Sequence, residues 1–152
     1  TTKLGVVTSS TPFGKMENEA DPLELYLTMG VSFIASGFSG NPRQLAGLIK
    51  EGMNHQGFSM VHVQSPCVTY NDTYELLKGK PKEGIEPLVW DIPEDHEPND
   101  KAAAYNLIQK RGLPIGVIYK DESRPSLDQR IEDIWSKSKE QTAQQLIDAY
   151  EF

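Results

Sequence analysis

Two short runs, Val31-Ser32-Phe33-Ile34-Ala35-Ser36 and Phe58–Val63, decide the fold together with the segment between them. Both runs are rich in β-branched and aromatic residues, which is typical of buried strands. The segment between them begins at Asn41-Pro42, a pair that favours a helix start, and ends at Gly57. A strand, a helix and a strand form a βαβ unit, so we expect the two strands to be parallel.

The helix in this unit has a predicted buried face made of apolar residues at helical spacing: Leu45, Leu48, Ile49 and Met53. The turn before it, Gly37-Phe-Ser-Gly40, could in principle bind an anion at the helix N-terminus. It matches neither dinucleotide nor P-loop patterns, which favours a plain tight turn.

The chain before this unit is expected to be a loop over residues 1–20 and a short helix over Leu23–Met29. Asp21-Pro22 supplies the helix cap and Gly30 ends the helix. The chain opens at Thr1-Thr2-Lys3 without Met. We expect it to be a fragment or a processed piece.

The chain after the unit is irregular over Ser65–Gly84, which holds two prolines and two glycines. A short strand at Pro87–Trp90, an acidic loop over Ile92–Asp100, a helix over Lys101–Lys110 and a strand at Pro114–Tyr119 follow. We divide the chain into residues 1–90, part of an α/β domain, and a C-terminal segment over residues 91–152.

The last segment begins with a capping box, Ser126-Leu-Asp-Gln129. The expected helix has an apolar stripe and could run on towards the C-terminus, through Leu127, Ile131, Ile134, Trp135, Leu146, Ile147 and Tyr150. The pattern as a whole predicts an α/β fold with three or four strands and a C-terminal helical extension.

Composition narrows the function. The 152 residues suffice for one domain with a core, and a net charge of −7 argues against nucleic acid as a partner. No apolar run approaches the roughly 20 residues that cross a bilayer, and no signal peptide is recognisable, so we expect no membrane partner. A single cysteine fits a reducing cytoplasm.

Ser65-Pro66-Cys67-Val68-Thr69 is the sharpest local feature, because it follows a predicted parallel strand at the edge where α/β sheets place their sites. The adjacent proline stiffens the turn, which suits a thiolate held towards a metal. A lone cysteine is more often a small buried hydrophobe. One thiolate also cannot hold a [4Fe–4S] cluster, which usually has four ligands.

The three histidines give weaker signals. His55 ends a helix, where a polar cap is common, and His62 on its strand fits either a core or a solvent-facing position. His96 lies among carboxylates that could bind a metal or move protons, although a solvated acidic loop is the commoner reading.

Three stretches resemble a known family when they are taken together: Thr8-Ser-Ser-Thr-Pro-Phe-Gly14, Gly37-Phe-Ser-Gly-Asn-Pro42 and Gly57-Phe-Ser-Met-Val-His-Val-Gln-Ser-Pro-Cys-Val-Thr-Tyr-Asn71. They resemble the second half of the thiamine-diphosphate-binding β subunit of 2-oxoacid:ferredoxin oxidoreductases, of the 2-oxoglutarate and broad-specificity type. Pro93-Glu-Asp-His96 and Leu113–Glu122 extend the likeness to about residue 125.

The resemblance implies a parallel-sheet, three-layer half of a thiamine-diphosphate-binding fold in an oxidoreductase subunit. It implies oxidative decarboxylation of a 2-oxoacid with coenzyme A, and electron transfer through a [4Fe–4S] cluster to ferredoxin. Cys67 matches the family's distant fourth cluster ligand. The Gly-Asp-Gly motif for diphosphate and Mg²⁺ has no counterpart in these 152 residues, so we expect the piece to be inactive alone.

The resemblance also implies partners: an α or αγ subunit in a hetero-oligomer, and ferredoxin. The basic cluster Lys78, Lys80 and Lys82 is by default a solvated loop, yet it follows Cys67 closely enough to help dock acidic ferredoxin.

Two other functions fit the residues. A cluster-free thiamine-diphosphate decarboxylase or synthase would share the fold and leave Cys67 inert and buried. A non-catalytic α/β fragment would only pack against partner chains.

Overall fold

The computed structural model describes residues 4–8, 10–69, 72–137 and 142–150. Thr1–Lys3 and the Tyr70-Asn71 end of the cysteine motif therefore lie outside the described residues. In chain order the elements are α1 (Pro22–Met29), β1 (Phe33–Phe38), α2 (Pro42–Asn54), β2 (Ser59–Gln64), α3 (Tyr74–Lys78), the 3₁₀ turn η1 (Pro81–Glu83), β3 (Val89–Asp91), α4 (Lys101–Ile108), β4 (Leu113–Lys120), α5 (Leu127–Lys137) and α6 (Ala143–Asp148).

One four-stranded sheet, in the order β2-β1-β4-β3, organises the chain. β1 and β2 are parallel, with Phe33 opposite Ser59, which confirms the βαβ unit around α2. β3, α4 and β4 make a second such unit with parallel strands. The two units meet antiparallel along β1 and β4, so the α/β class is confirmed while the sheet is mixed instead of wholly parallel. Sequence pattern gives the strand direction within each unit but not between units.

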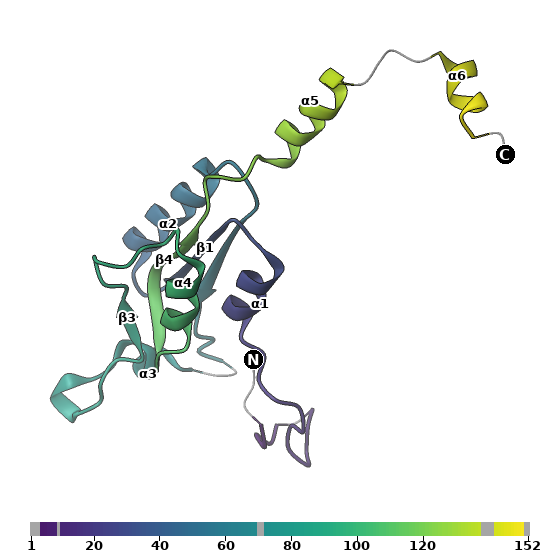
Figure 1. Ribbon diagram of the computed structural model, residues 1–152. Coiled ribbons are helices and arrows are strands. Elements are labelled where there is room, and N and C mark those ends of the chain that lie inside the picture. Colours follow the sequence, from purple (N-terminus) through teal and green to yellow (C-terminus); the bar gives the residue numbers. More distant parts are fainter. Residues whose placement is uncertain (1–3, 9, 70–71, 138–141, 151–152) are drawn as a thin grey trace.

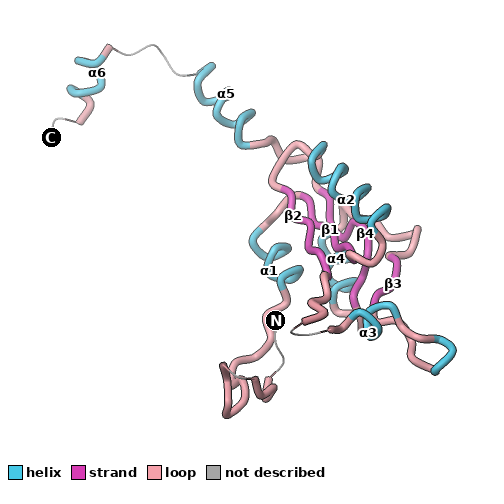
Figure 2. Tube along the Cα trace, turned by 180° about the vertical axis from the view of Figure 1, so that it is seen from behind, coloured by secondary structure: helices cyan, strands magenta, loops and turns pink. Residues whose placement is uncertain are grey.

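Three layers result, as Figures 1 and 2 show. On one face α2 packs through Leu48 against Phe33 and Ala35 of β1. On the other face α1 and α4 pack together against β1, β4 and part of β2, through residues that include Leu23, Leu27, Ile34, Ala104, Leu107 and Ile118. Because β3 and β4 complete this sheet, residues on both sides of the predicted division at residue 90 share one sheet; the division itself stays a prediction.

The caps explain where two helices begin and end. The carboxylate of Asp21 accepts the backbone N–H of Leu23 at 2.8 Å, and Gly30 ends α1 with a φ of 79°. Asn41 caps α2 through the backbone N–H of Gln44 at 3.4 Å. These boundaries agree with the sequence predictions to within a few residues.

The buried face predicted for α2 was wrong at two positions. Leu48 is buried, but Ile49 is 42% and Met53 is 81% exposed. The helix instead turns Gly52 to the sheet, where an added Cβ would lie 3.2 Å from Phe33 and 3.3 Å from Val61. The backbone of α2 therefore packs closely against the strands at Gly52, where apolar side chains were expected to pack.

The C-terminal helices extend away from the sheet as an arm, which we define as α5 and α6 (Figure 1). The capping box is confirmed, since the Gln129 side chain accepts the Ser126 N–H at 2.8 Å and Ser126 Oγ accepts the Gln129 N–H at 3.3 Å. The possible continuous helix is two helices, and residues 138–141 between them lie outside the described part. No helix among the described residues is long and apolar enough to cross a membrane.

Candidate functional site

Cys67 lies three residues after the end of β2, at the edge where β1 and β2 both present their carboxyl ends. The two strand ends are held together there, because the backbone N–H of Ser39 donates to the carbonyl of Gln64 at 3.0 Å. The Cys67 side chain is exposed. The edge position that the sequence predicted is confirmed, and Cys67 is not buried, as a lone cysteine more often is.

The following segment packs under the same edge of the sheet. The Phe38 and Tyr74 rings lie 5.7 Å apart, and Leu77 of α3 is buried against Phe38 and Ile115. This packing fixes the position of α3 and of the basic cluster that begins at its last residue, Lys78.

The three lysines of that cluster differ in their surroundings. Lys80 Nζ lies 2.7 Å from a Glu75 oxygen and 3.6 Å from a Glu83 oxygen. The Lys78 ammonium lies 5.6 Å from the centre of the Tyr74 ring. Lys82 is exposed in η1. Two carboxylates offset the charge of Lys80, so Lys78 and Lys82 present the more open positive charge.

Metal binding at this edge would need further ligands. Within residues 4–8, 10–69, 72–137 and 142–150, no group of three or more His, Cys, Asp or Glu side chains is arranged to hold a metal ion. An exposed thiol in a proline-stiffened turn suits one ligand of a shared cluster, with the other ligands supplied from elsewhere. The donor set of the described residues does not suit a complete site.

Two of the histidines, His96 and His62, differ in their surroundings. The Nε2 atom of His96 lies 2.8 Å from the carbonyl oxygen of Ile118. The ring N–H donates to this carbonyl, which fastens the acidic loop to β4. His62 has a buried Nδ1 with no hydrogen-bond partner among the described residues. Burial lowers the pKa of His62, because the charged imidazolium loses hydration there.

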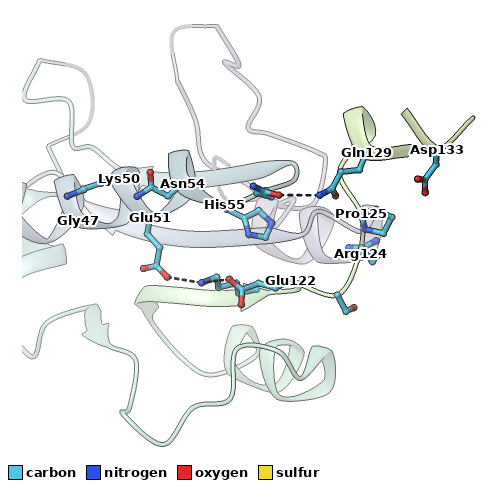
Figure 3. Close-up of a pocket in the computed structure, with 13 residues that line it drawn as sticks. Gly47, Lys50, Glu51, Asn54, His55, Glu122, Arg124, Pro125, Gln129 and Asp133 are labelled. Carbon is cyan, nitrogen blue, oxygen red and sulfur yellow. Dashed lines mark hydrogen bonds and ion pairs between the residues drawn. The ribbon is translucent and has the colours of Figure 1, made fainter. Parts of the chain in front are cut away.

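A hollow that the sequence did not reveal lies between the end of α2, the end of β4 and the start of α5 (Figure 3). Its volume is about 970 Å³. His55 lies in its wall, with Nε2 2.9 Å from Ser32 Oγ, and Ser32 Oγ in turn donates to the Phe58 carbonyl at 3.2 Å. These contacts fasten the C-terminal end of α2 to the starts of β1 and β2.

Charged side chains line the same hollow in pairs. Lys120 Nζ lies 2.8 Å from Glu122 and 3.6 Å from Glu51. The hydrogen bond with Glu122 raises the pKa of Lys120, and the same contact lowers the pKa of Glu122. This hollow is at the opposite end of β1 and β2 from Cys67, since it adjoins the strand starts.

Asp121 fixes the loop between β4 and α5. The carboxylate of Asp121 accepts hydrogen bonds from the hydroxyl and the backbone N–H of Ser123, and the Arg124 guanidinium lies 2.8 Å from it. These contacts lower the pKa of the Asp121 carboxyl. Arg124 also donates to the Gly30 carbonyl at 2.8 Å. Because Gly30 and Arg124 are 94 residues apart, no local pattern in the sequence could have indicated this contact.

Comparisons with known proteins agree on one family. The family model for the C-terminal part of the pyruvate ferredoxin oxidoreductase β chain matches residues 67–136. The 2-oxoacid:ferredoxin oxidoreductase subunit beta of Saccharolobus solfataricus is 30% identical over 138 residues, which are 86% of this chain and 45% of that protein. The 2-oxoglutarate synthase subunit KorB of Methanocaldococcus jannaschii is 31% identical over 88 residues, 58% of this chain and 32% of that one.

A solved structure has the same fold. It is a 2-oxoglutarate:ferredoxin oxidoreductase from Magnetococcus marinus with 2-oxoglutarate, coenzyme A and succinyl-CoA bound. The match has a TM-score of 0.81 and 33% sequence identity, and it covers 100% of this chain and 52% of that chain. The chain therefore spans about half the length of the Saccharolobus solfataricus subunit and of the Magnetococcus marinus chain.

Proposed function

The chain belongs to the β subunits of the 2-oxoacid:ferredoxin oxidoreductase family, and we propose that it forms the electron-exit half of such an enzyme. The complete enzyme would oxidatively decarboxylate a 2-oxoacid with coenzyme A. It would release CO₂ and an acyl-coenzyme A and pass two electrons, one at a time, to ferredoxin.

The observation that carries this proposal is the exposed Cys67 at the carboxyl edge of β1 and β2. We assign its Sγ as one ligand of a [4Fe–4S] cluster whose other ligands come from outside the described residues. Such a cluster accepts and releases single electrons. The backbone N–H groups of Val68 and Thr69, in the turn that follows Cys67, are the candidates for hydrogen bonds to the cluster sulfurs.

Thiamine diphosphate and Mg²⁺ would be bound elsewhere in the complete enzyme. These 152 residues hold no Gly-Asp-Gly motif for the diphosphate, and the described residues hold no group of three or more His, Cys, Asp or Glu side chains arranged for a metal. The described residues therefore do not fit this cofactor, and the chain's own contribution is to position the cysteine thiolate and the surface around it.

The partners follow from the same assignment. The β chain would assemble with an α or αγ subunit, and ferredoxin would dock near Cys67 with help from Lys78, Lys80 and Lys82. Lys78 is the last residue of α3 and the other two lysines follow it, and α3 packs under the edge that carries Cys67. With one cysteine and no disulfide of its own, the chain suits a reducing compartment, so we place the enzyme in the cytoplasm.

Substrate-dependent reduction of ferredoxin by the complete enzyme tests this function. The complete β chain and its companion subunit are purified without oxygen, and ferredoxin reduction is followed with 2-oxoglutarate and coenzyme A. We expect reduction that requires both substrates and releases CO₂. Decarboxylation without ferredoxin reduction, in a preparation that lacks iron, would instead indicate the cluster-free thiamine enzyme.

A further inference from the structure

The helix α5 has an apolar face that the described residues leave largely uncovered. Leu127, Ile131 and Ile134 are four and three residues apart and thus lie on one side of the helix. Leu127 is 71% and Ile134 is 66% exposed. An 11-residue helix is marginal on its own in water, and most helices owe their stability to packing of such a face.

The start of α5 is nevertheless fastened to the domain. Arg124 joins the loop before α5 to the Gly30 carbonyl and to Asp121, each at 2.8 Å. The Gln129 side chain donates to the Gln56 side chain at 3.3 Å. These contacts tie the start of the helix to the domain. The match to the solved enzyme chain covers 100% of this chain, so it includes the arm.

The apolar surface continues from the arm onto the domain. A hollow of about 920 Å³ lies beside the start of α5, and Leu127 and Phe58 both line it. Phe58 is 66% exposed. Leu127, Ile131, Ile134 and Phe58 form what we call the arm face. Exposed apolar surface of this kind, rimmed by charge, is characteristic of protein interaction sites.

The length and charge of α5 indicate what covers the arm face. Pairing between two copies of the helix as a coiled coil needs about three heptads, and α5 has 11 residues within the described part of the chain. Two copies of the chain would also bring together a net charge of −7 each. A helix with anchors four and seven residues apart instead suits a preformed apolar groove on another protein.

The charges beside the stripe define that groove further. Asp128 and Glu132, four residues apart, border one side of the stripe, and Arg130 and Lys137 border the other. We propose that the arm face docks into an apolar groove on the companion subunit, with a basic wall facing Asp128 and Glu132. The proposal rests on the proposed function, which supplies the companion subunit.

Charge placed on the stripe tests the docking. Ile134→Glu puts a carboxylate into the apolar contact, whereas Ser136→Glu adds the same charge to the opposite side of α5. We expect the first substitution in the full β chain to raise the dissociation constant for the purified companion subunit at least tenfold, and the second to change it less than threefold. Ile134→Leu should keep the affinity of the unmodified chain.

Hydrogen exchange on the unmodified proteins tests the same contact without a variant. Amides of α5 should exchange rapidly in the β chain alone and at least tenfold more slowly in the complex with the companion subunit. If Ile134→Glu fails to fold, this measurement still shows whether the companion subunit covers α5.

Three results would overturn the proposal: an unchanged dissociation constant for Ile134→Glu, equal exchange of α5 amides with and without the companion subunit, or loss of self-association in Ile134→Glu with companion binding intact. The last result would assign the arm face to a second copy of this chain. Both readouts measure assembly, so a complex that forms normally yet reduces no ferredoxin would refute the proposed function and leave this inference standing.

Discussion

The ammonium group of Lys80 lies 2.7 Å from a carboxylate oxygen of Glu75, and a second carboxylate, on Glu83, lies 3.6 Å away. Lys80 therefore differs from Lys78 and Lys82, which take part in none of the ion pairs found among the described residues. Only a positive charge that is not already offset attracts an acidic protein efficiently.

The lysines should therefore contribute unequally to ferredoxin docking. Lys78→Glu combined with Lys82→Glu should raise the apparent KM for ferredoxin about tenfold at low ionic strength, because long-range charge attraction is lost. Lys80→Glu alone should raise it less, and the triple reversal should have the largest effect. Steady-state ferredoxin reduction at two salt concentrations provides the measurement; an unchanged KM at low salt for the triple variant contradicts the assignment.

Backbone donors beside Cys67 should tune the potential at which electrons leave. Thr69→Pro removes one N–H group from the turn after the cysteine. In a folded, assembled enzyme we expect the midpoint potential of the cluster to become more negative, because the reduced cluster loses a hydrogen bond. A redox titration followed by EPR measures it, with Thr69→Ala as the control that keeps the N–H. Equal potentials in both variants would exclude Thr69 as a donor.

His62 should make the stability of the chain depend on pH. Burial lowers its pKa in the folded state below the ordinary value of 6.5, so the unfolded chain takes up the proton first as pH falls. The free energy of unfolding should therefore decrease from pH 7.5 towards pH 5. Urea unfolding at several pH values should show a flatter profile for His62→Gln than for the unmodified chain. A slope retained in His62→Gln contradicts the account.

Two glycines with positive φ provide a matched test of packing. Gly112 has a φ of +96°, and a Cβ there would lie 2.6 Å from the Leu88 carbonyl, whereas Gly84 has a φ of +73° and open space around it. Gly112→Ala should lower the free energy of unfolding by about 2–4 kcal/mol, through backbone strain and collision together. Gly84→Ala should cost about 1 kcal/mol, from strain alone. Similar losses in urea unfolding would show that the contact to Leu88 is unimportant.

Local patterns predicted the elements that depend on nearby residues. The cap at Asp21, the stop at Gly30 and the capping box from Ser126 to Gln129 all form as expected, because each needs only a few neighbouring groups. The parallel pairing of β1 and β2 follows in the same way from the length of the connection between them.

Long-range relationships could not be predicted in this way. The antiparallel contact of β4 with β1 depends on how two βαβ units meet, which neither unit encodes by itself. The turn of Gly52 towards the sheet in place of Met53 depends on the shape of Phe33 and Val61 opposite it. Periodicity correctly indicated an apolar stripe on α5 but not that the stripe lies outside the domain.

Some features of the candidate site could also be predicted from local patterns, and others could not. The position of Cys67 just beyond β2 could be predicted from strand pattern and motif, whereas its exposure could not, because a lone cysteine is more often buried. Its proposed role as a cluster ligand came from family resemblance, since one cysteine carries no ligand spacing. The hollow at the start of α5 is lined by residues between 47 and 56 and residues between 120 and 133, so no short stretch indicated it.

The most direct test of the account is an EPR spectrum of the dithionite-reduced complete enzyme, with and without Cys67→Ala. We predict a fast-relaxing [4Fe–4S] signal that is lost or converted to a three-iron signal in the variant, because one of four thiolate ligands is removed. An unaltered [4Fe–4S] signal in a folded Cys67→Ala enzyme would contradict the assignment of Cys67, and no iron signal in either protein would contradict the proposed enzyme class.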